Sequence, residues 1–128
     1  MRPLLLGLLM IFSLNLCAQE LDCSKFKNGK FRIDSEFIGE MIIERKGNKQ
    51  IEHLITIDKK STFKVKWIDE CTYTLKLKNQ AKDQLGAEMP KDFYLIVEII
   101  ETKENSYVTS TTSNYSNVPV IIELFKID

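Results

Sequence analysis

The sequence is poor in the residues on which most enzyme and metal sites depend. It has one histidine, His53, three cysteines, five glycines and one tryptophan. Catalysis by a Ser-His-acid or Cys-His group needs a histidine base, so any such site would have to include His53. Nucleotide-binding glycine loops and the H-E-x-x-H zinc motif are missing from the sequence. We therefore expect a protein that is not an enzyme.

An excess of charge of either sign is missing as well. The 18 Lys and Arg residues balance the 18 Asp and Glu residues, and the lysines alternate with acids instead of forming a block. Binding to nucleic acid depends on clustered cations that neutralise phosphates, so we expect no nucleic-acid partner. One histidine and few cysteines also make a poor zinc set, because structural zinc takes four ligands. We expect no metal and no cofactor.

Only one long apolar run occurs, and it lies at the N-terminus. Leu4 to Phe12 follows Arg2 and leads to the small residue Ala18. This pattern is typical of a secretory signal peptide, and the run is shorter than the roughly 20 residues of a membrane span. We expect a signal peptide over 1–18, a single exported domain over 19–128, and a periplasmic or extracellular location without a membrane span. Lipidation at Cys17 is the disfavoured alternative, because Leu16 replaces the usual small residue.

Removal of residues 1–18 would leave only Cys23 and Cys71 of the three cysteines. Two cysteines in an exported chain favour one disulfide. On the chain-entropy model a disulfide that closes a loop of this length contributes about 4 kcal/mol to stability. A redox-active pair usually has C-x-x-C spacing, which this pair lacks.

The mature region alternates apolar with polar residues at the period of a β-strand almost throughout. One predicted hairpin pairs Phe63–Trp67 with Tyr73–Leu77 around Asp69 and Glu70. Other expected strands cover 30–33, 41–45, 50–57, 93–100, 106–112 and 118–127, with a turn at Gly47 and Asn48. The strand over 93–100 is apolar on both faces except at Glu98, which predicts that both faces are covered. Pro119 should lie near a strand start or at an edge.

These strands predict an all-β fold. Short turns between successive strands favour an antiparallel meander of about eight strands, closed as a lipocalin-like barrel. The alternative is a strongly curved sheet, one face of which is covered by 79–92. That segment breaks the strand pattern and is expected to be a loop or one short helix.

The aromatic residues give the main functional indication. Phe31, Phe63, Trp67, Tyr73 and Phe93 fall on strand faces expected to point inward, where they would line a cavity or simply fill the core. Glu98 is either a buried acid with a raised pKa that binds a ligand group, or a polar break on an exposed face. His53 shares a strand face with Ile51, Ile55 and Ile57, which predicts a packed, hydrogen-bonded side chain and not a general base.

Two stretches also carry a resemblance. Asp22-Cys23-Ser24-Lys25-Phe26-Lys27-Asn28-Gly29-Lys30-Phe31, together with Phe63 to Leu75 around the W-x-x-x-C-x-Y-x-L pattern, looks like a group of small exported bacterial proteins of unknown function. Some of those proteins carry a name taken from a topoisomerase subunit, which size, export and charge contradict here. The resemblance supports pairing of Cys23 with Cys71 and transfers no catalytic residue. The segment 28–31 also resembles, weakly, the G-x-W start of lipocalins, with Phe31 in place of Trp.

The sequence leaves two functional hypotheses open. In the first, a monomeric β-barrel holds a small apolar or amphipathic ligand. In the second, the core is filled and the protein binds an envelope or extracellular protein, as an inhibitor does, through 79–92 or through the Ser- and Thr-rich strand.

Overall fold

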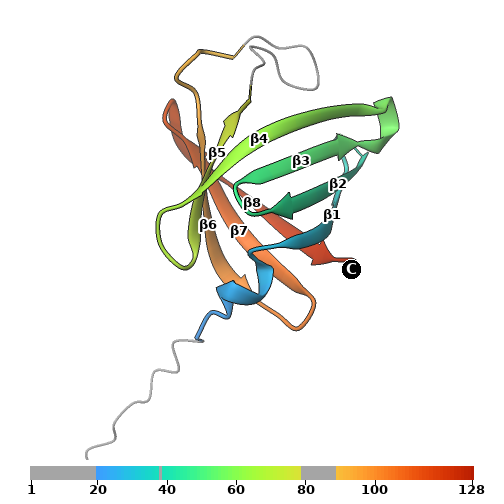
Figure 1. Cartoon of the computed structure of the whole chain (residues 1–128), viewed down its shortest axis with the longest axis vertical. Coiled ribbons are helices and arrows are strands. Elements are labelled where there is room, and N and C mark those ends of the chain that lie inside the picture. The colour runs from blue at the N-terminus through green and yellow to red at the C-terminus, as the bar shows by residue number, and fades with distance from the viewer. Residues whose placement is uncertain (1–19, 38, 79–88) are drawn as a thin grey trace, which may run out of the picture.

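The computed structural model describes residues 20–37, 39–78 and 89–128. The predicted signal peptide and the segment 79–88, which makes up most of the predicted irregular connection, lie outside these residues. Within them the chain forms one antiparallel barrel whose strands follow each other in sequence order (Figure 1). The predicted meander and barrel closure are therefore confirmed.

Eight strands are present in the part of the chain that the structure describes. They are β1 (Gly29–Ser35), β2 (Gly39–Lys46), β3 (Lys49–Leu54), β4 (Lys59–Trp67), β5 (Thr72–Leu77), β6 (Leu95–Thr102), β7 (Ser106–Ser113) and β8 (Ser116–Lys126). Two short 3₁₀ helices, η1 (Cys23–Phe26) and η2 (Ile55–Ile57), accompany them.

The predicted hairpin of β4 and β5 is present. Phe63 pairs with Leu77, Val65 with Leu75, and Trp67 with Tyr73. The β2–β3 hairpin turns at Gly47 and Asn48 as expected, and Gly47 has φ +60°, a conformation that glycine adopts readily. β3 ends at Leu54, and the residues predicted to continue it form η2 instead.

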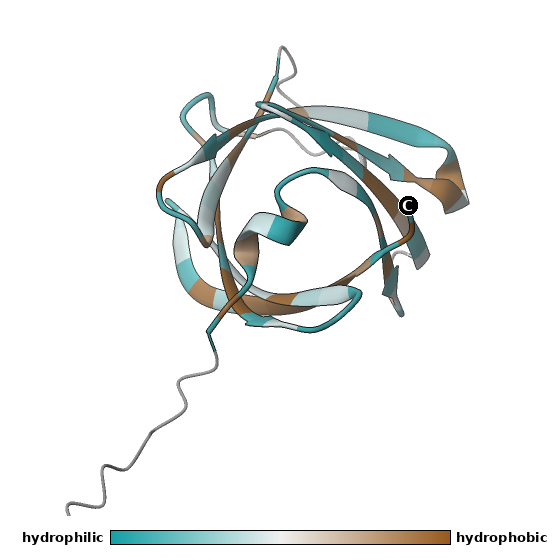
Figure 2. Cartoon of the chain, turned by 60° about the horizontal axis from the view of Figure 1, so that its bottom comes forward, coloured by the Kyte–Doolittle hydropathy of each residue, from teal (hydrophilic) through white to brown (hydrophobic). Residues whose placement is uncertain are grey.

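The core lies inside the barrel, where alternate residues of each strand point. Its largest fully buried apolar side chains are Tyr73, Tyr107, Phe26, Phe31 and Ile99. Phe26 comes from η1, which lies within the ring of strands when the barrel is viewed from below (Figure 2). One end of the barrel is therefore closed by the chain's own N-terminal segment.

The prediction that the β6 region is covered on both faces is wrong. Val97 and Ile99 are buried, whereas Glu98 is exposed and Ile100 is 45% exposed. A barrel of one sheet has a single buried face, and no element among the described residues packs over the outside of β6. Of the two alternatives for Glu98, the polar break on an exposed face is therefore the one found, and the buried acid is not.

Pro119 lies near the start of β8, as predicted. The pairing of β7 with β8 shifts register between Thr111 and Ser113, opposite this part of β8. A residue without an N–H is tolerated in a sheet at such an irregularity or at an edge.

Candidate functional site

An internal cavity of about 80 Å³ is the candidate ligand site of the barrel. Most of its wall is aliphatic, and polar side chains from β3, β5 and β7 interrupt it. The polar residues are Gln50, Glu52, Tyr73, Thr109 and Thr111; the apolar ones are Ile33, Met41, Ile43, Leu75, Leu95, Val97, Ile122 and Leu124. A pocket with this lining suits a group that is mainly apolar and carries one polar end.

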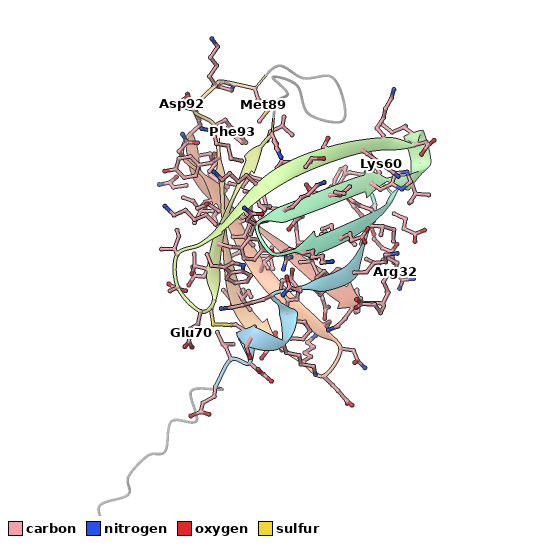
Figure 3. All side chains as sticks on the ribbon, in the orientation of Figure 1. Arg32, Lys60, Glu70, Met89, Asp92 and Phe93 are labelled. Atoms are coloured by element: carbon pink, nitrogen blue, oxygen red, sulfur yellow. A yellow bond between two sulfur atoms is a disulfide. The ribbon has the colours of Figure 1, made fainter. Side chains whose placement is uncertain are left out.

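The predicted aromatic residues do not line this cavity, with the exception of Tyr73. Phe31 is fully buried, and Trp67 and Phe63 are half-buried against the core. Phe93 precedes β6 and stacks on Tyr115 with 6.1 Å between ring centroids; it lies far above η1 in Figure 3. The aromatic set is therefore divided between the closed end of the barrel and its outer rim.

Arg45 is the centre of the closed end, and its side chain points into the barrel with only 1% of its surface exposed. Its Nε donates to Gln50 Oε1 at 2.9 Å, and its Nη1 donates to the Phe26 carbonyl at 2.8 Å. Its Nη2 donates to the hydroxyl oxygens of Tyr73, at 3.2 Å, and Tyr107. A buried guanidinium needs such partners, because an unpaired buried charge is very costly.

Aromatic rings surround the same guanidinium. The Arg45 Cζ lies 4.5 Å from the ring centroid of Tyr73, 5.0 Å from that of Phe31 and 5.8 Å from that of Tyr107. The face of an aromatic ring attracts a cation at these distances. Phe31 and Tyr73, which the sequence places inward, thus enclose an arginine of the protein itself.

The disulfide between Cys23 and Cys71 fastens η1 beneath this cluster. Its sulfur atoms are bonded, with 5.3 Å between the Cα atoms, and the predicted pairing is confirmed. Cys71 follows the β4–β5 turn near Glu70, where the bond is visible in Figure 3. Because the Phe26 carbonyl of η1 accepts from Arg45, the disulfide and the buried arginine stabilise the same closure.

Glu52 is the most strongly perturbed acid that the structure describes. The side chain points inward from β3 and lines the cavity. The residue as a whole is half-buried, but its carboxyl group is surrounded by protein. Burial raises its pKa to about 7, and the positive charge of Arg45 acts in the opposite direction. Burial also raises the pKa of Tyr73 and of Tyr107. The cavity wall therefore holds a carboxyl group that changes charge near neutral pH.

The sequence reasoning missed Arg45 and Glu52. Arg45 lies on the same face of β2 as Met41 and Ile43, because alternate residues of a strand share a face. That alternation is the signal that could have placed Arg45 inside. In β3 the inward residues are Gln50, Glu52 and Leu54, whereas Ile51 and His53 lie on the other face. The apolar character of Ile51 indicated the wrong face.

His53 is hydrogen-bonded as predicted, but it does not pack in the core. Its Nε2 lies 2.7 Å from Asp58 Oδ1 on the outer surface, in a region whose surface side chains include Lys60 (Figure 3). Asp58 is 87% exposed. Among the residues that the structure describes, no group of three or more His, Cys, Asp or Glu side chains is arranged to hold a metal ion.

A second concavity of about 660 Å³ lies outside the barrel, at the lower ends of β1 and β2. It is open to solvent and is lined by charged side chains of both signs, including Lys30, Glu44, Lys46 and Asp128. Ligand pockets usually enclose most of the ligand behind apolar walls. The internal cavity has mainly apolar walls, whereas charged side chains surround the outer concavity.

None of the described helices is long and apolar enough to cross a bilayer. Comparison with protein-family profiles, with curated proteins and with solved structures gave no match to this chain.

Proposed function

We propose that this protein is an exported binding protein whose barrel holds an apolar or amphipathic ligand. The observation that carries the proposal is the internal cavity, with its aliphatic wall and its polar groups at Glu52 and Tyr73. The N-terminal apolar run supports export, and the disulfide is consistent with an oxidising compartment.

The size of the cavity limits what enters it. Sites for whole small molecules usually measure about 300–1,000 Å³, whereas this cavity measures about 80 Å³. One apolar group of a ligand fits inside, and the rest of the ligand has to lie at the opening. A short alkyl chain with a polar end has the required shape and chemistry.

Native mass spectrometry of the protein, purified from its own export compartment, tests for such a ligand. The expected result is the mass of residues 19–128 with the disulfide formed, together with a small molecule that can be released from the protein. An NMR titration with n-butylamine and with butyrate then locates the site through the methyl groups of Ile33, Val97 and Leu124.

Paired substitutions on β7 separate cavity binding from surface binding. Thr111→Phe places a ring in the cavity, whereas Ser110→Phe places the same ring on the outer face next to it. We expect Thr111→Phe to weaken probe binding about tenfold, a loss of about 1.4 kcal/mol, and Ser110→Phe to leave it unchanged. Equal binding by both variants, with folding verified by circular dichroism, would contradict a ligand site inside the barrel.

The second candidate is an interaction module that binds an envelope or extracellular protein. It is favoured by aliphatic side chains that remain exposed on β8: Val118 is 70% exposed, Val120 56% and Ile121 58%. Neighbouring exposed apolar residues on a protein surface often mark a contact site. A pull-down from envelope extract that enriches no protein would count against this candidate.

A further inference from the structure

The barrel closes along only a short part of its last seam. β1 and β8 pair through Phe31 with Lys126 and Arg32 with Phe125, and one further backbone bond joins the Ile127 N–H to the Lys30 carbonyl. β8 begins nine residues before Phe125, at Ser116. Along the side of β8 that faces β1, the residues from 116 to 124 therefore have no strand partner among the described residues.

The direction of the backbone groups along this seam follows from the printed contacts at its closed end. The Lys126 N–H donates to Asn105, at the β6–β7 turn, whereas the next N–H, that of Ile127, donates to β1. Successive residues of a strand direct their N–H and C=O groups to opposite sides. Ile121 and Glu123 consequently direct theirs toward the open seam, and Asp34 does the same from β1.

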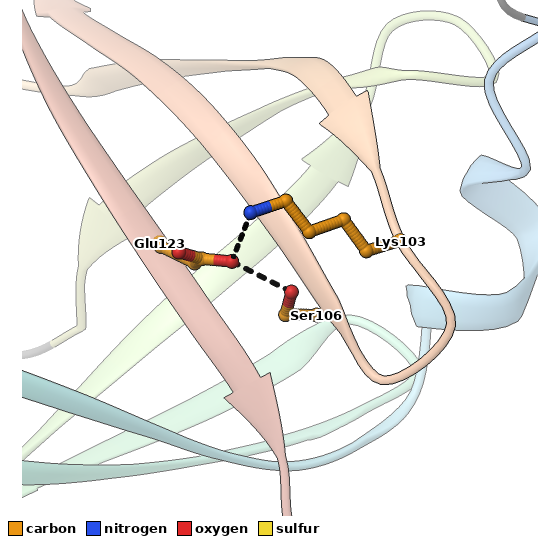
Figure 4. Close-up of polar contacts among 3 residues, drawn as sticks. All are labelled: Lys103, Ser106 and Glu123. Carbon is orange, nitrogen blue, oxygen red and sulfur yellow. Dashed lines mark hydrogen bonds and ion pairs between the residues drawn. The ribbon is translucent and has the colours of Figure 1, made fainter.

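Two carboxylates would face each other if the pairing of β1 with β8 continued, as Asp34 and Glu40 already do across β1 and β2. If the register of Phe31 with Lys126 continued, Asp34 would lie directly opposite Glu123, and like charges in that position destabilise a sheet. Glu123 accepts from Ser106 Oγ at 2.7 Å and from Lys103 Nζ at 3.0 Å (Figure 4). These contacts lower its pKa and keep it ionised.

The open seam leads to the cavity. Ile33 at the β1 edge, and Ile122 and Leu124 at the β8 edge, all line it. A strand placed between the two edges would direct alternate side chains into the cavity and outward, because the side-chain period of a strand is two. The cavity has room for roughly two or three water molecules, which suits one inserted side chain better than a whole molecule.

We propose that an extended peptide segment of a partner protein binds between β1 and β8 as an added strand. An apolar side chain of this segment enters the cavity, and the next residue, a Lys or Arg, lies outside between Asp34 and Glu123. Backbone groups of the segment pair with those of Ile121 and Glu123, which a small amphipathic molecule cannot do. The inference goes beyond the proposed function, since the ligand is a polypeptide.

Charge and surface composition at the seam both support a basic-apolar segment. On the β1 side, Asp34 lies 3.4 Å from Arg32, and two further exposed carboxylates follow: Glu36 after the end of β1, and Glu40 opposite Asp34 on β2. On the β8 side, Glu123 already has Lys103, and the residues from 116 to 122 carry no charge. The exposed side chains of Val120 and Ile121 flank the seam and would be covered by the added strand.

Fluorescence anisotropy on the full-length mature protein tests this proposal. The probe is a labelled hexapeptide, Lys-Val-Lys-Leu-Lys-Val, and we expect a Kd on the order of 10 μM. Replacement of the lysines by glutamate, or N-methylation of alternate peptide nitrogens, should abolish binding. Absence of binding by the lysine peptide, or binding that survives N-methylation, would overturn the proposal.

Two variants of the protein make the test specific. Asp34→Lys should weaken binding of the lysine peptide about tenfold, whereas Glu98→Lys, which makes the same change on the outside of β6, should not. Ile121→Pro removes an N–H on the open side and should weaken binding while β7 pairing persists. If Asp34→Lys and Glu98→Lys behave alike, the peptide does not bind at the seam.

The outcome is separable from that of the proposed function. n-Butylamine binding should persist in the Ile121→Pro variant, because that change leaves the cavity wall intact. Loss of peptide binding with retained amine binding would overturn only the peptide inference. Sedimentation of the free protein tests whether a second copy of the chain occupies the seam. A dimer in which the Ile121 amide is protected from hydrogen exchange would mean that it does, and would overturn the peptide proposal.

Discussion

Arg45 stabilises the closed end of the barrel through its fork of donors and its ring contacts. Arg45→Met would leave the Phe26 carbonyl and the Gln50 side chain without their donor. We expect a loss of about 3 kcal/mol in the free energy of unfolding, measured by urea denaturation. Arg45→Lys should recover little, because an ammonium group cannot reproduce the planar fork.

The matched control for Arg45 is Arg32→Met on the outer face of β1, where the Arg32 side chain pairs with the exposed Asp34. We expect that change to stay within about 0.5 kcal/mol of the parent protein. Similar losses for both variants would mean that the buried contacts of Arg45 contribute no more than surface ones.

Glu52 makes stability depend on pH. Its pKa is raised from 4.5 to about 7 in the folded protein, so between these values the folded state holds a proton that the unfolded state has lost. Stability therefore falls as pH rises through this window, and remains lower above it. The variant Glu52→Gln lacks this dependence and should gain stability relative to the parent between about pH 5 and about pH 8.

Urea midpoints at the two pH values measure this difference, with Glu98→Gln on the outer face as the control. If the stabilities of the parent and of Glu52→Gln change with pH in the same way across this window, the raised pKa of Glu52 is contradicted.

At the residue scale the sequence predicted which residues alternate but not always which face is inside. Local pattern predicts the inward position of Phe31 and Tyr73 correctly, and the cysteine count together with the resemblance predicts the disulfide. The inward face of β3 was not predicted correctly, because Gln50 and Glu52 face the interior while Ile51 faces outward. The inward position of Gln50 makes sense only once Arg45 is known to lie opposite, and that is a contact between strands.

The 3₁₀ helix η1 is an element that depends on one covalent bond. With Cys23 and Cys71 both changed to Ser, we expect the protein to lose up to about 4 kcal/mol, mainly because the unfolded chain gains freedom. Thermal unfolding measured with and without reductant provides the test. Reductant should lower the Tm of the parent and leave that of the double variant unchanged; an effect of reductant on the double variant would exclude this explanation.

At the element scale the hairpins were predictable because turn residues and alternation are local signals. The β4–β5 hairpin and the Gly47–Asn48 turn follow from them. The coverage of β6 was not predictable in this way, since an apolar residue such as Ile100 at a water-facing position is common and carries no information about what packs on it.

For the whole molecule, the incomplete seam predicts an asymmetry in hydrogen exchange along β8. The amides of Ile122 and Leu124 face β7 and should exchange slowly, whereas those of Ile121 and Glu123 face the open seam and should exchange quickly. Amide exchange followed by NMR resolves these residues individually. Equal protection of all four amides would show that the seam is closed in solution.

The closed meander was predictable from strand count and short turns, but its seam was not. Pairing of β1 with β8 joins residues nearly a hundred positions apart, and its extent depends on which side chains meet there. The conflict between Asp34 and Glu123 appears only after Phe31 has been paired with Lys126. The cavity is similarly lined by seven strands together, so its size could not be derived from any one of them.

The position of Trp67 has a spectroscopic consequence. It is the only tryptophan of the chain, and its ring lies 4.6 Å from Tyr73, 6.0 Å from the Arg45 guanidinium and 5.2 Å from Lys27 Nζ. Its emission is therefore a reporter of the end of the barrel that η1 closes. Detachment of η1 should change the wavelength and the intensity of that emission. Binding at the seam between β1 and β8 should leave the emission unchanged.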